Sequence, residues 1–211
     1  MIKNNSEYSM GTSIESQFKD RNIVIMAGGT GGHVFPALAV AKALAEKGAN
    51  ISWLGTARGI EAKVIPEHFP LDLIKVKGIR NKKVLAKLGF PFQLLGAVFN
   101  ARQILKDRKA NLVIGFGGYA SGPGALAAKL LSVPILIHEQ NAKAGATNRY
   151  LAKIAKEVMC AFPCQDFSKA KVTVVGNPIR AEILKIAETP KNFDAEKLNC
   201  LIVGGSLGVE V

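Results

Sequence analysis

Apolar residues along the chain follow two alternating patterns. Short runs rich in valine, isoleucine and leucine predict strands, and longer stretches with helical spacing of apolar residues predict helices. The expected strands are Asn22–Ala27, Asn50–Leu54, Leu71–Lys75, Asn111–Ile114, Pro134–His138, Glu157–Cys160, Lys171–Val175 and Asn199–Val203. The expected helices are Pro36–Lys47, Gly59–Ile65, Phe92–Arg108, Gly122–Leu131, Gly145–Ala155 and Arg180–Ile186. This alternation predicts an α/β fold, a doubly wound, Rossmann-like parallel sheet with helices on both faces.

The first strand runs directly into a glycine-rich turn, Gly28-Gly29-Thr30-Gly31-Gly32. Proline is favoured in the first turn of a helix, so we expect the next helix to begin near Pro36. Glycines let the backbone approach a ligand closely, and the N–H groups at the start of a helix attract anions. The turn therefore predicts a binding site for a phosphate or diphosphate. The alternative is a tight connection that binds no ligand.

Two common nucleotide-binding motifs do not fit this turn. No Gly-Lys-Ser/Thr follows it, which excludes a P-loop of the Walker type. A dinucleotide motif aligned on Gly29 lacks its third glycine, because Val34 occupies that position. The strand that ends at Gly55 also lacks the acidic residue that would bind a ribose. The sequence therefore disfavours a nicotinamide-binding role.

Four further loops at strand ends carry glycines or polar side chains. They are Gly115–Gly124, His138-Glu139-Gln140-Asn141, Val175–Arg180 and Gly204–Gly208. The first of these precedes a predicted helix and offers a second anion cradle. In doubly wound folds ligands bind beyond the carboxyl ends of the strands, where all these loops are expected to lie. Two glycine loops in one domain indicate a ligand with both a diphosphate and a sugar.

The organisation along the chain predicts one main domain with two flanking parts. Residues 1–20 are polar, without periodicity or an apolar core segment, and indicate a loose N-terminal extension, not a signal peptide. Residues 21–187 form the predicted α/β domain, and residues 188–198, which include Pro190, have the character of a linker. Residues 199–211 contain a fresh strand and glycine loop, as at the start of a second domain of which we expect only the first strand.

Positive charge is concentrated in one part of the chain. The 28 basic and 16 acidic residues leave a surplus of twelve positive charges. The segment Lys75–Lys109 holds ten basic residues and one acidic residue, interleaved with aromatic and aliphatic side chains. This pattern suits an anionic membrane surface, although a solvated helix with an ordinary core face is the alternative. No nucleic-acid recognition motif accompanies the charge, and no apolar run approaches the ~18 residues of a membrane span.

The cysteines give no indication of a metal or redox site. Cys160, Cys164 and Cys200 are an odd number without an export signal, so reduced thiols are expected. No further cysteine or histidine lies near Cys160 and Cys164 to complete a metal site. We expect neither a metal nor a cofactor.

Seven short motifs together resemble one family. GGTGGHVFPALAVA, WLGT, GFGGYASGPG, HEQN, TNR, VGNPIR and GGSLG occur in the order found in the MurG family, over roughly residues 22–208. The resemblance implies the N-terminal, acceptor-side domain of a two-domain GT-B glycosyltransferase. It implies transfer of N-acetylglucosamine from its UDP form to undecaprenyl-linked muramoyl-pentapeptide (lipid I), which gives lipid II with inversion. It further implies a peripheral protein at the cytoplasmic face of the bacterial inner membrane, in peptidoglycan synthesis, cell shape and cell division.

The resemblance also implies roles for individual residues. His33 is similar in position to the family's proposed base, with orientation of a phosphate or capping of the helix as the alternative. Glu139 is the alternative base, or it is a structural hydrogen-bond partner. The positions that match contacts to the donor nucleotide-sugar are Thr30, Gly31, Gly32, Asn141, Arg180 and Ser206. The two glycine loops are expected to hold the acceptor diphosphate through Gly28, Gly29, Gly117, Gly118, Tyr119 and Ser121.

Two other functions compete with this one. A different lipid-acceptor glycosyltransferase, such as a diacylglycerol sugar transferase, fits HEQN and GGYASGPG less well. A non-catalytic peripheral membrane module that binds a lipid-linked diphosphate sugar is favoured by the small part of the second domain that follows GGSLG.

Overall fold

The computed structural model describes residues 17–57, 59–76, 90–167 and 171–188. In this part of the chain seven strands form one parallel sheet in the order β3-β2-β1-β4-β5-β6-β7. The strands are β1 (Asn22–Ala27), β2 (Asn50–Thr56), β3 (Leu71–Ile74), β4 (Leu112–Gly117), β5 (Ile135–Glu139), β6 (Glu157–Cys160) and β7 (Val172–Val174). The predicted α/β class is confirmed.

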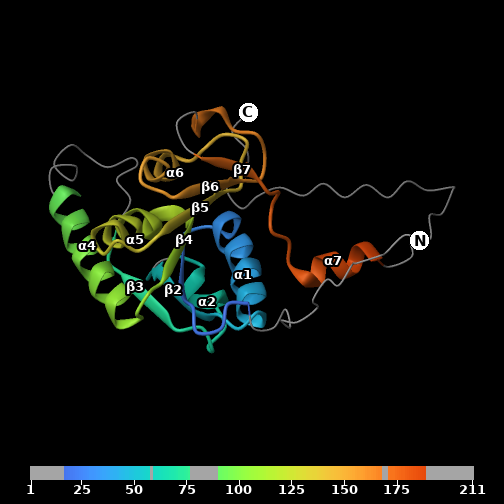
Figure 1. Cartoon of the computed structure of the whole chain (residues 1–211), viewed down its shortest axis with the longest axis horizontal. Helices are drawn as coiled ribbons and strands as arrows, with labels where there is room; N and C mark the ends of the chain where they lie inside the picture. The colour runs from blue at the N-terminus through green and yellow to red at the C-terminus, as the bar shows by residue number, and fades with distance from the viewer. Residues whose placement is uncertain (1–16, 58, 77–89, 168–170, 189–211) are drawn as a thin grey trace, which may run out of the picture.

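Helices cover both faces of the sheet (Figure 1). They are α1 (Gly31–Glu46), α2 (Glu61–Val64), α4 (Phe90–Asp107), α5 (Gly118–Leu130), α6 (Ala146–Leu151) and α7 (Ala181–Glu188), with a 3₁₀ turn, η2, at Gln165–Phe167. Helix α1 lies on one side of the sheet, and α4 and α5 lie on the other. Helix α7 extends away from the body of the domain (Figure 1).

The central strand β1 illustrates why both faces need cover. Successive side chains of a strand point to opposite faces, and β1 is apolar on both. Ile23 and Ile25 pack with α1 in one buried cluster, whereas Val24 and Met26 pack with α4 and α5 in the other. The indole N–H of Trp53, fully buried in β2, donates to the carbonyl of Ala27 (2.9 Å) and fixes the end of β1.

The strand order reverses beside β1. From β1 the chain builds outward through β2 and β3, and it then returns to place β4 on the other side of β1. In doubly wound folds the helices on the two sides of such a point leave in different directions, so a ligand crevice is expected where the carboxyl ends of β1 and β4 meet. Ala27 and Gly117 pair across this point, and α1 and α5 begin beside it.

The predicted starts of the two helices at this crevice were wrong. α1 begins at Gly31, not near Pro36, and α5 begins at Gly118, not at Gly122. Each helix carries its proline as its sixth residue, at Pro36 and Pro123, beyond the first turn. A proline there removes the bond to the carbonyl four residues earlier and crowds that carbonyl, yet both helices continue through it and glycines form their first turns. The other elements agree with the prediction within a few residues at most ends, although the helix from Gly145 is shorter and ends at Leu151.

Three predicted parts lie outside the described residues. They are most of the N-terminal extension, the linker after residue 188, and the strand Asn199–Val203 with its glycine loop. Within the described ranges, no helix is both long and apolar enough to cross a membrane.

Candidate functional site

The two glycine loops touch each other at the crevice. A Cβ atom added to Gly118 would collide with the carbonyl oxygen of Gly28, so the backbones of the two loops are in direct contact. Gly117 and Gly118 have φ angles of +104° and +80°, which side chains other than glycine rarely adopt. The N-termini of α1 and α5 therefore open onto the same space.

His33 lies in the first turn of α1 and faces the second glycine loop. A Cβ atom on Gly117 would come within 2.9 Å of both Cδ2 and Nε2 of the imidazole. The Nδ1 atom is buried and has no hydrogen-bond partner among the described residues. Burial lowers the pKa of His33 below its ordinary value, and the charge of Glu139 opposes this shift more weakly. The imidazole is therefore neutral at neutral pH and has a nitrogen that can accept a proton.

Thr30, Gly31 and Gly32 form the start of α1 in front of His33. Thr30 is extended, its side chain makes no capping bond, and its carbonyl accepts the N–H groups of His33 (3.2 Å) and Val34 (3.3 Å). The N–H groups of Gly31 and Gly32 have no partner within the helix, as at any helix N-terminus. Among the described residues these two N–H groups have no other hydrogen-bond partner, so the turn offers two donors beside the imidazole of His33.

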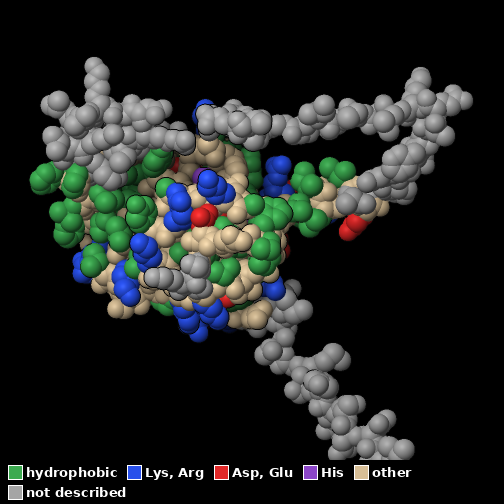
Figure 2. All heavy atoms as spheres, turned by 90° about the horizontal axis from the view of Figure 1, so that it is seen from above, with side chains coloured by type: hydrophobic (Ala, Val, Ile, Leu, Met, Phe, Trp, Pro, Cys, Tyr) green, Lys and Arg blue, Asp and Glu red, His purple; other side chains and the backbone are tan. Residues whose placement is uncertain are grey.

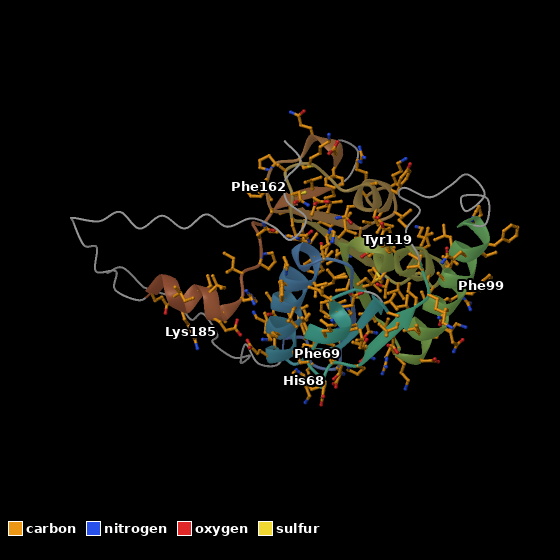
Figure 3. The ribbon with its side chains drawn as sticks, turned by 180° about the vertical axis from the view of Figure 1, so that it is seen from behind. His68, Phe69, Phe99, Tyr119, Phe162 and Lys185 are labelled. Atoms are coloured by element: carbon orange, nitrogen blue, oxygen red, sulfur yellow. The ribbon has the colours of Figure 1, made fainter. Side chains whose placement is uncertain are left out.

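The second loop divides between exposed and buried side chains. Tyr119, labelled in Figure 3, is half-exposed (49%). Ser121 is fully buried, and its hydroxyl lies 2.8 Å from the carbonyl of Met26 and 2.7 Å from that of Gly117. The same hydroxyl accepts the N–H of Gly117 (3.2 Å). Ser121 therefore braces the loop against β1 and does not reach the crevice surface with its side chain.

Glu139, at the end of β5, is a buried carboxylate surrounded by N–H donors. One oxygen accepts the backbone N–H of Asn141 (3.0 Å) and its side-chain amide (2.9 Å). The other accepts the N–H of Gly145 (3.0 Å) and the side-chain amide of Asn148 (2.9 Å). These four bonds hold the loop onto α6 and use the lone pairs that a base would need. The geometry favours a role for Glu139 as a structural hydrogen-bond partner over a role as the base.

His138 joins the β5 loop to the loop after β7. Its Nε2 donates to the carbonyl of Gly176 (3.0 Å), and its Nδ1 accepts from the side-chain amide of Gln140 (3.2 Å). The side-chain amide of Asn177 donates to the carbonyl of Gln140 (3.2 Å) and adds a second link. Burial lowers the pKa of His138, while the bond to Gly176 partly offsets the shift. The neutral imidazole is the form that satisfies both bonds.

Arg180 reaches the first glycine loop through an aromatic ring. Its guanidinium carbon lies 4.7 Å from the ring centroid of Phe35, a cation–π geometry. The Phe35 ring in turn packs on Gly31, where an added Cβ would lie 2.9 Å away. The loop before α7 is thereby attached to the start of α1. Ser206, the last predicted site residue, lies outside the described residues.

Two residues of this region were not singled out from the sequence. Asn148 links Glu139 to the crevice, because its amide nitrogen would lie 3.7 Å from a Cβ on Gly117, and its Oδ1 is buried without a partner in the described chain. Glu61 is fully buried under the first glycine loop and accepts the N–H of Gly29 (3.0 Å). A glutamate among apolar residues after WLGT was the available signal for Glu61. Across the described ranges no group of three or more His, Cys, Asp or Glu is placed to hold a metal ion.

Comparison with known proteins gives one family and several relatives. The sequence profile of the glycosyltransferase family 28 N-terminal domain matches residues 23–160. UDP-N-acetylglucosamine--N-acetylmuramyl-(pentapeptide) pyrophosphoryl-undecaprenol N-acetylglucosamine transferases of Shewanella woodyi and Francisella philomiragia are each 50% identical, over 194 and 200 residues. The alignments cover 91% of this chain in both cases but 53% and 54% of the relatives. The chain thus spans about half the length of the curated relatives it matches.

Solved structures agree with this assignment. MurG of Acinetobacter baumannii superposes with a TM-score of 0.62 at 49% identity, over 71% of this chain and 44% of that one. The calicheamicin glycosyltransferase CalG4 superposes with a TM-score of 0.51 at 16% identity, over 75% of this chain and 53% of that one. The second similarity is one of fold alone.

Proposed function

The chain belongs to the glycosyltransferase family 28 N-terminal domain family, and from this membership we propose that it is the acceptor-side half of a two-domain GT-B enzyme. The enzyme transfers N-acetylglucosamine from UDP-N-acetylglucosamine to lipid I and produces lipid II. The names of the half-identical relatives support this choice of donor and acceptor. The observation that carries the proposal is the junction of two helix N-termini and a neutral histidine at the crevice between β1 and β4.

The reaction assigns His33 the role of general base. The oxygen of the muramoyl 4-hydroxyl attacks the anomeric carbon of the donor from the face opposite to UDP. As this C–O bond forms, the bond to the diphosphate breaks, UDP leaves with the electron pair, and His33 takes the hydroxyl proton. A histidine whose pKa is lowered by burial is already unprotonated at neutral pH, which this step requires. An orienting role for His33 is the competing assignment.

The glycine loops supply the electrostatic part of the proposal. The free N–H groups of Gly31 and Gly32 and the N-terminus of α5 at Gly118 face the crevice, where they suit a diphosphate. The acceptor diphosphate lies along these loops, beside Tyr119. The donor contacts proposed for this half are Thr30, Gly31, Gly32, Asn141, Arg180 and Ser206. In this arrangement Arg180 acts from its stacked position on Phe35.

We also propose that the domain binds the anionic cytoplasmic face of the bacterial inner membrane. Helix α4, which packs along α5, exposes Phe92 (79%), Leu95 (54%) and Phe99 (61%). Hydrophobic side chains gather at the left of Figure 2, on the side where Figure 1 places α4. Phe99 lies on the side of the molecule away from α7 (Figure 3). Exposed apolar groups on this scale mark an interaction surface.

Basic side chains also gather on the surface of the domain. Lys129 of α5, Lys153 and Lys156 line one hollow of the domain, and no acidic residue lies in that lining. Further charge comes from the segment Lys75–Lys109, of which residues 77–89 lie outside the described ranges. A surface that combines exposed apolar and basic side chains is typical of proteins that bind anionic membranes.

A sugar-transfer assay tests the proposed function. Radiolabelled N-acetylglucosamine is offered as the UDP form to a lipid I analogue, with residues 1–211 alone and with the C-terminal half of a relative supplied. We expect little transfer by residues 1–211 alone, since a cleft closed on one side only leaves the leaving group solvated. Transfer should appear in the complemented mixture and fall by about 10²–10⁴-fold in His33→Gln. Transfer to diacylglycerol in its place, or binding of lipid I without transfer after complementation, would establish one of the two competing functions.

A further inference from the structure

Glu61 is a buried carboxylate for which the proposed reaction has no use. Its side chain is fully buried at the start of α2, and one oxygen accepts both the N–H (2.8 Å) and the hydroxyl (2.9 Å) of Thr56. The other oxygen accepts the N–H of Gly29 (3.0 Å). No Lys, Arg or His of the described chain forms a salt bridge with it. Within the described residues only N–H and O–H donors hold this carboxylate, so each of them offsets part of the cost of burying it.

Three glycines make room for this carboxylate. A Cβ on Gly28 would lie 2.5 Å from Oε1 of Glu61, and one on Gly55 would lie 2.7 Å from its Cγ. A Cβ on Gly59 would collide with the carboxyl group. The backbone of the first glycine loop, the end of β2 and the turn before α2 therefore close around one side chain. Part of the glycine content of this region serves Glu61 and not a ligand.

The contacts of Glu61 lead directly to both glycine loops. Gly29 has a φ of +98°, and it is held from the α2 side at both ends, because its N–H donates to Glu61 and its carbonyl accepts the N–H of Ile60 (3.3 Å). Its neighbour Gly28 rests with its carbonyl against Gly118. The position of Gly29 thereby determines where the first loop meets the second.

We propose that Glu61 is a positioning residue that holds the Gly28–Gly32 loop in its anion-binding conformation and, through Gly28, sets the contact with Gly118. Glu61 accepts the N–H of Gly29, whereas the N–H groups of Gly31 and Gly32 remain for the ligand. The identity of that ligand as a diphosphate rests on the proposed function. The conformation of the loop does not.

The test uses two substitutions of Glu61 in the ¹⁵N-labelled chain. Glu61→Gln keeps the shape but must turn an amide N–H toward either Thr56 or Gly29, and Glu61→Met removes every acceptor. The first readout is amide hydrogen exchange at Gly29, and the second is titration with inorganic pyrophosphate, followed at the amides of Gly31, Gly32 and Gly118. In Glu61→Met we expect exchange at Gly29 to rise at least about tenfold and pyrophosphate affinity to fall at least about tenfold, the scale of a lost hydrogen bond to a charged group. In Glu61→Gln we expect any rise in exchange at Gly29 to be accompanied by a fall in pyrophosphate affinity.

Two control variants separate positioning from general destabilisation. Val158→Ala opens a cavity in β6, away from both loops, and lowers the melting temperature without changing either readout. Thr56→Val removes the hydroxyl bond to Glu61 and leaves the Gly29 bond in place, so pyrophosphate affinity stays within about threefold of the wild type while some stability is lost.

The outcomes of this experiment separate the two proposals. Unchanged exchange at Gly29 in Glu61→Met, or a loss of affinity in Val158→Ala equal to that in Glu61→Met, overturns the positioning role. If the wild type does not bind pyrophosphate, the diphosphate assignment under the proposed function fails. In that case exchange at Gly29 and the amide shifts of Gly118 still decide whether Glu61 positions the loops.

Discussion

The imidazole of His33 lies so close to Gly117 that a side chain at position 117 would collide with it. The imidazole edge formed by Cδ2 and Nε2 lies where a Cβ of residue 117 would be 2.9 Å away. Gly117 ends β4, and His33 stands in the first turn of α1, so this contact joins the two sides of the crevice. The orientation of the proposed base is therefore set by the absence of a side chain on the opposite loop.

Gly117→Ala should displace His33 and strain the second loop. With φ +104° and ψ −170°, Gly117 lies in a backbone region that is essentially restricted to glycine, and we expect alanine to cost about 1–3 kcal/mol in the free energy of unfolding. The complemented transfer activity should fall more than this loss explains, by about 10²-fold, because the base moves from its place. Chemical denaturation and the transfer assay measure the two effects separately.

Gly122→Ala is the matched control in the same helix. An added Cβ there would have its nearest neighbour, Cγ2 of Thr147, at 4.0 Å, and its φ is not in the positive range. Alanine at this helical position should leave stability unchanged or raise it by up to about 1 kcal/mol, with full activity. Equal activity losses in Gly117→Ala and Gly122→Ala would contradict the proposed His33–Gly117 relationship.

Two histidines with lowered pKa values predict a stability that falls in mild acid. The pKa values of His33 and His138 are lowered in the folded chain, chiefly by burial. Below the ordinary pKa of about 6.5 the unfolded chain therefore binds more protons than the folded chain, so the free energy of unfolding decreases as pH falls. The slope reaches at most about 1.4 kcal/mol per pH unit for each histidine, until its folded pKa is reached.

Urea denaturation between pH 8 and pH 5 measures this slope. His138→Gln removes one of the two groups and should give a shallower dependence, although it lowers stability at pH 8. Gln103→Ala, an exposed change on α4 that adds or removes no titrating group, should reproduce the wild-type slope. Equal slopes in His138→Gln and the wild type would show that burial of His138 does not control its protonation.

The sheet was predictable because its strands are buried on both faces. Ile23 to Ala27 form an unbroken apolar run with polar residues before it and glycines after it, so β1 was predicted with both ends correct. The starts of α1 and α5 were not, and for α1 the reason is that Pro36 was taken as the mark of a first turn. Local propensity does not reveal that glycines precede each proline within the helix, where contact between the two loops holds them.

The site was predictable in its location but not in its internal contacts. The motifs place His33 and Gly117 near the same edge of the sheet, since parallel strands end together there. Ser121 was expected in the loop, yet its burial depends on β1, which is 95 residues distant along the chain. Glu61 was missed for the same reason, because its partner Gly29 is 32 residues away and no local spacing encodes that bond.

Glu139→Gln should act on stability more than on the pH dependence of transfer. In the wild type both carboxylate oxygens accept N–H bonds. In glutamine an NH₂ group replaces one oxygen and faces N–H donors, so we expect a loss of about 2–4 kcal/mol in the free energy of unfolding. The complemented enzyme should still show activity that decreases as pH falls through the pKa of His33, which lies below 6.5. Loss of this acidic limb in Glu139→Gln, but not in His33→Gln, would make Glu139 the base.

Membrane binding should depend on the apolar side chains that α4 exposes and on the basic residues of the segment Lys75–Lys109. Phe92 and Phe99 are 79% and 61% exposed, so replacing both with serine should leave the free energy of unfolding within about 0.5 kcal/mol. If they insert into the membrane, the same change should weaken co-sedimentation with phosphatidylglycerol vesicles at least about tenfold, since burial of one phenylalanine contributes about 1.5–3 kcal/mol. Ile186→Ser, at an exposed position (64%) on α7, is the matched control and should bind like the wild type.

The charge contribution is measured on the same vesicles across a salt series. Each basic residue near an anionic surface contributes about 1 kcal/mol, so glutamate at Lys82, Lys83 and Lys87 should abolish binding at low salt. Binding should also fall as salt rises and as phosphatidylcholine replaces the anionic lipid, because screening and neutral headgroups both remove the attraction. Equal binding to anionic and neutral vesicles, unchanged in the triple glutamate variant, would exclude an electrostatic contribution to membrane binding. If the triple glutamate variant loses binding and Phe92→Ser/Phe99→Ser binds like the wild type, docking rests on charge alone and the apolar groups stay outside the bilayer.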